Sequence, residues 1–114
     1  MTIAAICDHE AITVTPKVAS TGDSLGVEYE DGTAFTKRCL VQELSAQEAL
    51  GYKAEGFEVD YIFYFSANPG IKKRDKITTA DGVQVEVKAA FREGRPGKWL
   101  LWVVLGDSIE TRDR

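Results

Sequence analysis

Residue types that could do chemistry gather in few places, and the first is a possible set of metal ligands near the N-terminus. Cys7-Asp8-His9-Glu10 offers several donor atoms, and His9 is the single histidine of the chain. A structural zinc ion requires four nitrogen or sulfur ligands, and only Cys39 could add to Cys7 and His9. We therefore expect an ordinary strand end there, with no metal and no other cofactor. We also expect no enzymatic activity, because catalysis needs a nucleophile, a base or a metal in a workable set.

The second candidate is the run Gly94-Arg95-Pro96-Gly97-Lys98, which is similar in composition to a phosphate-binding loop. Its two glycines are too close together for that motif, and Trp99 stands where a magnesium-binding Ser or Thr is required. The run is more typical of a turn between two strands.

Acidic residues mark the segment 18–32, which is rich in Gly, Ser, Asp and Glu and contains few large apolar residues. This composition predicts a long flexible loop or a hairpin with a mobile tip. Its carboxylates lack the spacing of a calcium-binding loop, and they favour a solvated surface. The carboxylates that we single out are those of Glu28, Glu30 and Asp31.

Basic residues mark two other segments, which lie at Lys72, Lys73, Arg74 and Lys76, and at Arg92, Arg95 and Lys98. Either segment could meet phosphates or an acidic protein surface, or could be a solvated turn. Asp75 interrupts the first segment. We expect it to cap the turn into the following strand, because its short side chain can accept hydrogen bonds from backbone amides two residues further on.

Length and composition limit the classes of protein that fit. The 114 residues are enough for one domain, which we expect to span 1–105, with a flexible C-terminal tail at 106–114. The chain has no apolar run of the roughly 20 residues that a membrane span needs and no secretory signal pattern, so we expect a soluble protein inside a cell with both cysteines reduced. The net charge of −4 argues against sequence-independent binding to duplex DNA, which depends on Lys and Arg at the phosphates.

Apolar periodicity predicts mostly strands. Two segments place alternate apolar residues on one side: Phe57, Val59, Tyr61, Phe63 and Phe65, and then Val83, Val85, Val87, Ala89 and Phe91. A short strand at 76–79 and the turn Ala80-Asp81-Gly82 make the second segment part of a hairpin. The run 99–105 is apolar on both faces, as expected of a central strand covered by a helix, the far wall of a barrel or a neighbouring subunit.

Weaker patterns complete the predicted fold. The segment 33–44 carries Phe35, Cys39 and Val41 on one face, and 11–14 indicates another short strand. Ser45 and Glu48 fit a capping box, and Gly51 can end a helix, so we expect one short helix at 46–50. The fold class is mainly β, a small partly open antiparallel β-barrel or sandwich, because closure removes the free edges of short strands.

The order of these features resembles one known family. The resembling residues are Ser45, Gln47, Glu48 and Gly51, the aromatic strand 61–66, Ile71, the segment 74–77, Asp81-Gly82, the segment 85–87, and the last apolar strand with Trp99 and Trp102. In this order the chain resembles the head-tail connector proteins of tailed phages, also called stopper, head-closure or head-tail joining proteins. The resemblance covers about residues 33–105.

The resemblance implies a structural protein of the virion, made in the host cytoplasm. About twelve identical subunits would form a ring between the portal and its adaptor above and the tail below. The ring would close the DNA-filled capsid and provide a channel through which the genome passes without specific binding. Within that role we expect three sets of residues to act. The acidic residues facing the channel would be Glu28, Glu30 and Asp31. The residues docking onto partner proteins would be Lys72, Lys73, Arg74, Arg95 and Lys98. The residues at the subunit interface would be Trp99, Leu100, Trp102 and Val104.

Two other readings stay open. A tail-completion or tail-terminator protein is also small and ring-forming. A monomeric barrel of the SH3 or OB type could instead bind peptide or single-stranded nucleic acid by stacking on Tyr61, Tyr64, Trp99 and Trp102. The negative net charge counts against nucleic acid binding.

Overall fold

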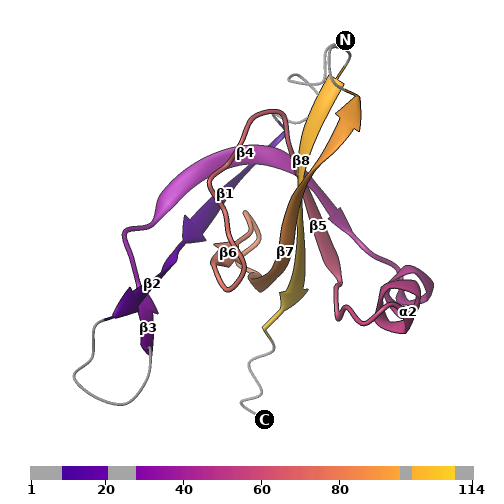
Figure 1. Cartoon of the computed structure of the whole chain (residues 1–114), viewed down its shortest axis with the longest axis horizontal. Coiled ribbons are helices and arrows are strands. Elements are labelled where there is room, and N and C mark those ends of the chain that lie inside the picture. Colours follow the sequence, from indigo (N-terminus) through magenta and orange to yellow (C-terminus); the bar gives the residue numbers. More distant parts are fainter. Residues whose placement is uncertain (1–8, 21–27, 96–98, 110–114) are drawn as a thin grey trace.

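A closed six-stranded barrel forms most of the molecule. The computed structural model describes residues 9–20, 28–95 and 99–109. The barrel strands are β1 (Glu10–Thr15), β4 (Phe35–Glu43), β5 (Tyr61–Phe65), β6 (Lys76–Thr78), β7 (Gln84–Arg95) and β8 (Trp99–Ser108). They pair antiparallel in the order β1-β4-β5-β8-β7-β6, and β1 also pairs with β6 (Figure 1). The predicted mainly β class is confirmed, and that last pairing closes the barrel.

Two short strands leave the barrel as a hairpin, which we call the arm. β2 (Lys17–Ser20) follows β1 after Pro16, and β3 (Glu28–Asp31) precedes β4. They pair antiparallel from Lys17 opposite Asp31 to Ser20 opposite Glu28. Of the two forms expected for 18–32, the hairpin is present: residues 18–20 and 28–31 lie in strands, so the long flexible loop is wrong there, and residues 21–27 lie outside the described residues. Figure 1 shows the arm reaching away from the barrel on the side opposite the helix.

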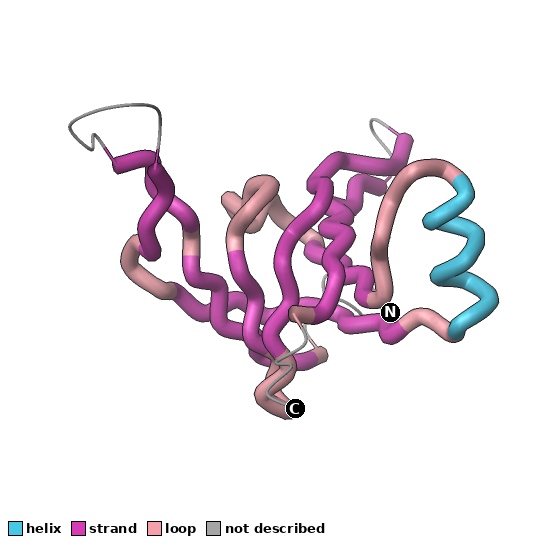
Figure 2. Tube along the Cα trace, turned by 90° about the horizontal axis from the view of Figure 1, so that it is seen from below, coloured by secondary structure: helices cyan, strands magenta, loops and turns pink. Residues whose placement is uncertain are grey.

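The helix α2 (Ala46–Ala54) lies beside the outer surface of the barrel (Figure 2). Its capping box is confirmed: the Glu48 amide donates to Ser45 Oγ at 3.2 Å, and the Ser45 amide donates to Glu48 Oε1 at 2.9 Å. The predicted end at residue 50 is wrong, because the helix continues through Gly51. The glycine that follows the C-cap of the helix is Gly56, and its φ of +96° is a backbone conformation that residues other than glycine rarely adopt.

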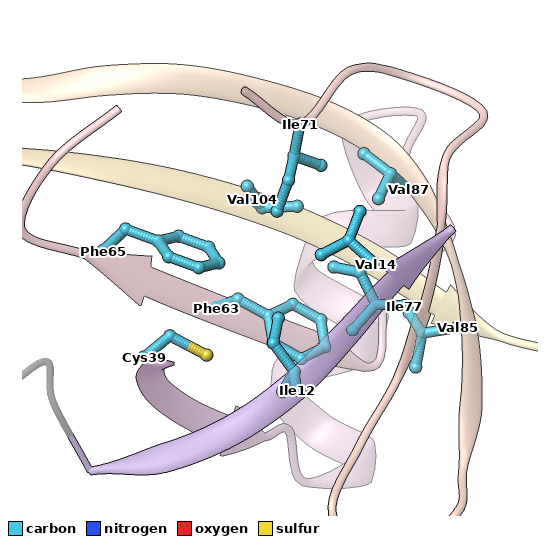
Figure 3. Close-up of a cluster of buried hydrophobic side chains, with 10 residues drawn as sticks. All are labelled: Ile12, Val14, Cys39, Phe63, Phe65, Ile71, Ile77, Val85, Val87 and Val104. Carbon is cyan, nitrogen blue, oxygen red and sulfur yellow. The ribbon is translucent and has the colours of Figure 1, made fainter. Parts of the chain in front are cut away.

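The barrel interior is filled by one cluster of ten buried side chains, drawn in Figure 3. Phe63, fully buried, lies among Ile12, Val14, Cys39, Phe65, Ile71, Ile77, Val85, Val87 and Val104. Phe35 and Val41 pack against this cluster from the same face of β4 as Cys39, as predicted. Burial of this apolar surface is the main contribution to the stability of the barrel.

A second cluster lies on the outer surface of β5 and β8. It contains buried Val59, Ile62, Val103 and Leu105, with Tyr52 of α2 and Tyr64 packed against them. β8 pairs with both β5 and β7, and its two apolar faces meet the two clusters. The far wall of the barrel and α2 therefore provide the two covers that the sequence requires for a central strand.

Two predicted strand faces are wrong in part. β5 begins only at Tyr61, so Phe57 lies outside the strand and 40% of it is exposed. In β7 the register shifts between Val87 and Ala89. Because one residue changes the face of every following side chain, Ala89 packs against the outer cluster and Phe91 is exposed, where the alternation predicts both to point inward.

The domain boundary expected after Leu105 is also wrong. β8 continues to Ser108, whose amide donates to Asp60 Oδ1 at 2.8 Å, and the Ile109 amide donates to the Gln84 carbonyl oxygen at 2.7 Å. Residues 106–109 therefore belong to the barrel, and residues 110–114 lie outside the described residues.

Candidate functional site

A buried carboxylate joins the arm to the barrel. Asp75, only 1% exposed, precedes β6, and its Oδ2 accepts from the Lys72 amide at 2.9 Å. Its Oδ1 accepts a hydrogen bond of 3.0 Å from the amide of Lys17, which is the first residue of the arm. Asp75 does cap its turn, but through an amide three residues earlier in the chain, where we expected one two residues later. Its contact with Lys17 spans 58 positions of the sequence and has no local signal.

The turn before Asp75 contacts the arm a second time. The Arg74 guanidinium stands 4.8 Å from the centre of the Tyr29 ring, and Nη1 donates to Tyr29 Oη at 3.1 Å. This arrangement combines a cation–π contact with a hydrogen bond. Arg74 is therefore engaged by the arm of its own chain. Lys72 and Lys73 are exposed, and within the described residues neither forms an ion pair.

The predicted acidic surface is divided by the structure. Asp31 forms an ion pair with Lys17, and this hydrogen bond and the Lys17 charge hold the pKa of the Asp31 carboxyl below its ordinary value. Its negative charge is thus offset, so Asp31 is a poor candidate for repelling DNA in a channel. Glu30 is exposed on β3. The backbone of Glu28 lies in β3, and its side chain lies outside the described residues.

The predicted docking residues are brought together only in part. Lys72, Lys73 and Arg74 lie at the base of the arm and form what we call the basic turn. Arg95 is the last residue of β7, with a side chain outside the described residues, and Lys98 lies wholly outside them. A meeting of the two basic segments therefore stays a prediction.

The predicted subunit interface needs a correction. Val104 is 1% exposed and belongs to the interior cluster, so its side chain cannot meet another subunit. Trp102 shares that inward face of β8 and packs against the same cluster, partly buried. Trp99 and Leu100 belong to β8, and their side chains lie outside the described residues. At Trp102 and Val104, the apolar residues that suggested an interface are explained by packing in the barrel interior.

Other apolar side chains are more exposed, and sequence analysis missed them. Leu50 of α2 is 64% exposed, and Phe57 and Phe91 are 40% and 42% exposed. The periodicity placed Phe57 and Phe91 inward. For Leu50 the sequence does contain a signal, because the sequence of α2 lacks the apolar stripe of a helix that packs firmly on a core. In agreement, no residue of α2 is buried in the structure.

An open cleft of about 460 Å³ lies between α2 and the strands β4 and β5, and we call it the helix cleft. Its lining consists of Gln42, Leu44, Glu48, Gly51, Tyr52, Glu55, Ile62 and Tyr64. Tyr64 Oη donates to Gln42 Oε1 at 3.0 Å. Burial, followed by nearby Tyr52, Glu93 and Glu48, raises the pKa of the Tyr64 phenol. The cleft is therefore aromatic inside and carries carboxylates.

Three of the four aromatic residues considered for a stacking surface pack within the chain, and the side chain of Trp99 lies outside the described residues. Tyr61 stacks on Phe63, with ring centres 6.2 Å apart, and burial raises the pKa of its phenol. Tyr64 packs against the outer cluster, and Trp102 packs against the inner one. Each of these three side chains is partly buried, and Tyr64 also lines the helix cleft.

The structure places two of the three residues considered for zinc. Cys39 lies in the barrel interior, His9 is exposed, and Cys7 lies outside the described residues (Figure 3). Across the described ranges, no three His, Cys, Asp or Glu side chains lie close enough together to hold a metal ion. Among the described residues, the helix α2 is too short to cross a membrane.

Comparison with known proteins supplies a likeness in fold. No model of a known protein family matches the chain, and no curated protein matches it. Among solved structures, the chain is similar to protein SF1141 from Shigella flexneri 2a, determined in solution, with a TM-score of 0.56 and 15% sequence identity over 100% of both chains. At this identity the similarity shows the fold alone, and function has to be argued from the surfaces.

Proposed function

We propose that this chain is a structural protein of the neck of a tailed phage, where identical copies form a ring between the portal–adaptor assembly and the tail. One observation carries the proposal: the closed barrel presents two unlike surfaces on opposite sides. The arm and the basic turn lie on one side, and α2 with its carboxylates lies on the other (Figures 1 and 2). A ring requires two different patches on each subunit, since each copy meets its neighbours head to tail.

The shape of the molecule supports the same role. The principal extents are 50 × 30 × 27 Å, with the barrel between the arm and the helix (Figure 1). A closed barrel has no free edge through which copies would join without limit, so contacts are left to the side-chain surfaces and the arm. In this proposal the ring closes the filled capsid, receives the tail and later lets the genome pass, and no covalent bond is made or broken.

The negative net charge suits a channel for DNA. Phosphates are repelled by carboxylates along a narrow passage, so the genome does not adhere to the wall. We assign the channel-facing role to Glu30 and Glu28, and we withdraw it from Asp31, whose charge is offset by Lys17.

The test is to mix the purified chain with portal–adaptor complexes and to image the particles by electron microscopy. The proposal expects an additional ring stacked on the adaptor in the absence of tail proteins. Complexes without added density would contradict it. A ring that forms on tail tubes would instead identify a tail-terminator protein, and salt-dependent binding to oligonucleotides would identify a monomeric binding module.

A further inference from the structure

The basic turn and the surface around α2 carry opposite charges, although the arm beside the basic turn also presents the exposed carboxylate of Glu30. On the arm side, Lys72 and Lys73 present two exposed ammonium groups, while the nearby Asp31 is already paired with Lys17. On the helix side, carboxylates surround α2, and the cation among the residues lining the adjacent cavities is Lys53. These carboxylates belong to Glu48, Glu55, Glu58, Asp60 and Asp107.

The helix cleft has the chemistry of a site for an ammonium group. Tyr52 and Tyr64 supply aromatic rings, and Glu48 and Glu55 supply carboxylates. A Lys side chain is attracted both by the face of an aromatic ring and by a nearby carboxylate, and its four-carbon stem can lie along apolar surface. Leu44, partly exposed in the same lining, provides such surface.

We propose that the helix cleft of one copy receives the basic turn of a second copy, with Lys73 beside Glu55 and Lys72 near the same rim. This contact rests on the proposed function, because it supplies the join between neighbours in the ring. The basic turn contacts the arm through Arg74, and the cleft is lined by residues of α2. Because α2 lies across the barrel from the arm (Figure 1), one copy can use both patches at once. Such head-to-tail contacts generate a ring when their rotation closes.

The contact between two free copies is expected to be weak. Exposed ion pairs each contribute little, and salt screens them. A complete ring is more stable than one pair, because closure lets every copy make both contacts. The association should therefore depend on protein concentration and should fall as ionic strength rises.

The experiment measures self-association of the full chain by sedimentation over a wide range of concentration at low salt. Lys73→Glu and Glu55→Lys are compared with the wild type. Each should weaken association about tenfold, because attraction is replaced by repulsion. An equal mixture of the two variants should recover it, since Lys73 of one variant meets Glu55 of the other.

Matched controls carry the same charge changes elsewhere. Lys37→Glu alters an exposed residue of β4, and Asp81→Lys alters an exposed turn. Both controls should associate as the wild type does, and all variants should show the wild-type circular dichroism. The proposal is overturned if the wild type stays monomeric throughout, if the mixture fails to recover association, or if the controls weaken it equally.

The two proposals can fail separately. If Lys73→Glu and Glu55→Lys form rings on portal–adaptor complexes as the wild type does, the contact is wrong and the neck function stands. If association follows the charges but the portal complexes gain no ring, the contact stands and the neck function is wrong.

Discussion

The barrel and the arm are both antiparallel β structure, yet they are held in place by different forces. The barrel encloses the cluster around Phe63, whereas none of the arm's described side chains is buried; Val18 is 48% and Tyr29 47% exposed. An isolated two-stranded hairpin is marginally stable in water. The position of the arm therefore depends on polar contacts at its base, which the sequence patterns of strands do not report.

The largest difference between the two regions should follow from shortening Phe63. Phe63→Ala leaves a cavity in the centre of the barrel and should lower the free energy of unfolding by about 3–5 kcal/mol. Urea unfolding followed by circular dichroism measures this loss. The matched arm variant, Tyr29→Ala, should cost less than about 1 kcal/mol. Equal losses for both would contradict the distinction between barrel and arm.

A change at the joint should affect the arm more than the barrel. Asp75→Ala removes the acceptor of the Lys17 and Lys72 amides and should cost about 2–3 kcal/mol. Hydrogen exchange measured by NMR should speed up at Lys17 and along the arm by a larger factor than at β5. Asp75→Asn keeps one acceptor oxygen and should lose less. An equal increase in the exchange rate across the chain would show that Asp75 stabilises the whole fold and has no specific effect on the arm.

The helix side should respond to pH through Asp107. Burial, followed by the Asp60 charge, raises the pKa of the Asp107 carboxyl. A pKa raised by folding means that the folded state favours the protonated acid, so stability falls as pH rises through the folded-state pKa. Asp107→Asn should therefore stabilise the chain by a few tenths of a kcal/mol at neutral pH, with the gain vanishing below about pH 4. Urea unfolding at several pH values checks this, and a gain independent of pH would contradict it.

The smallest effect concerns the ion pair at the base of the arm. The hydrogen bond and charge of Lys17 lower the pKa of Asp31, so the stabilisation is present above the ordinary carboxyl pKa and is lost as pH falls through the lowered value. Lys17→Ala should raise the Asp31 pKa toward that of an unpaired Asp, as measured by NMR titration. The unfolding midpoint should hardly change, because exposed ion pairs contribute little. An unchanged Asp31 titration would show that the pair is absent in solution.

The sequence predicts the barrel better than its outer surface, for a physical reason. Alternation identifies Phe63, Val85 and Val87, because one face of each strand is dry. It fails at Phe91, because the shift in register between Val87 and Ala89 occurs at Lys88, and no residue there signals an irregular strand in the sequence. Gly51 misleads as a helix end because glycine is also tolerated inside a helix at modest cost.

The candidate surfaces are harder to predict because their residues meet from distant parts of the chain. Arg74 and Tyr29 are 45 positions apart, and the helix cleft joins α2 to two strands. Composition singled out the basic run around Lys73, whose docking role stays a prediction. It could not show that Arg74 and Asp75 contact the arm of the same chain, whereas Lys72 and Lys73 are exposed.

The central claim is that copies of this barrel surround the passage between capsid and tail. The most direct measurement is to locate gold-labelled copies of the chain in intact phage particles by electron microscopy. We expect labels confined to the junction of capsid and tail, with about twelve copies in each particle. Intact particles that carry no label at that junction would contradict it.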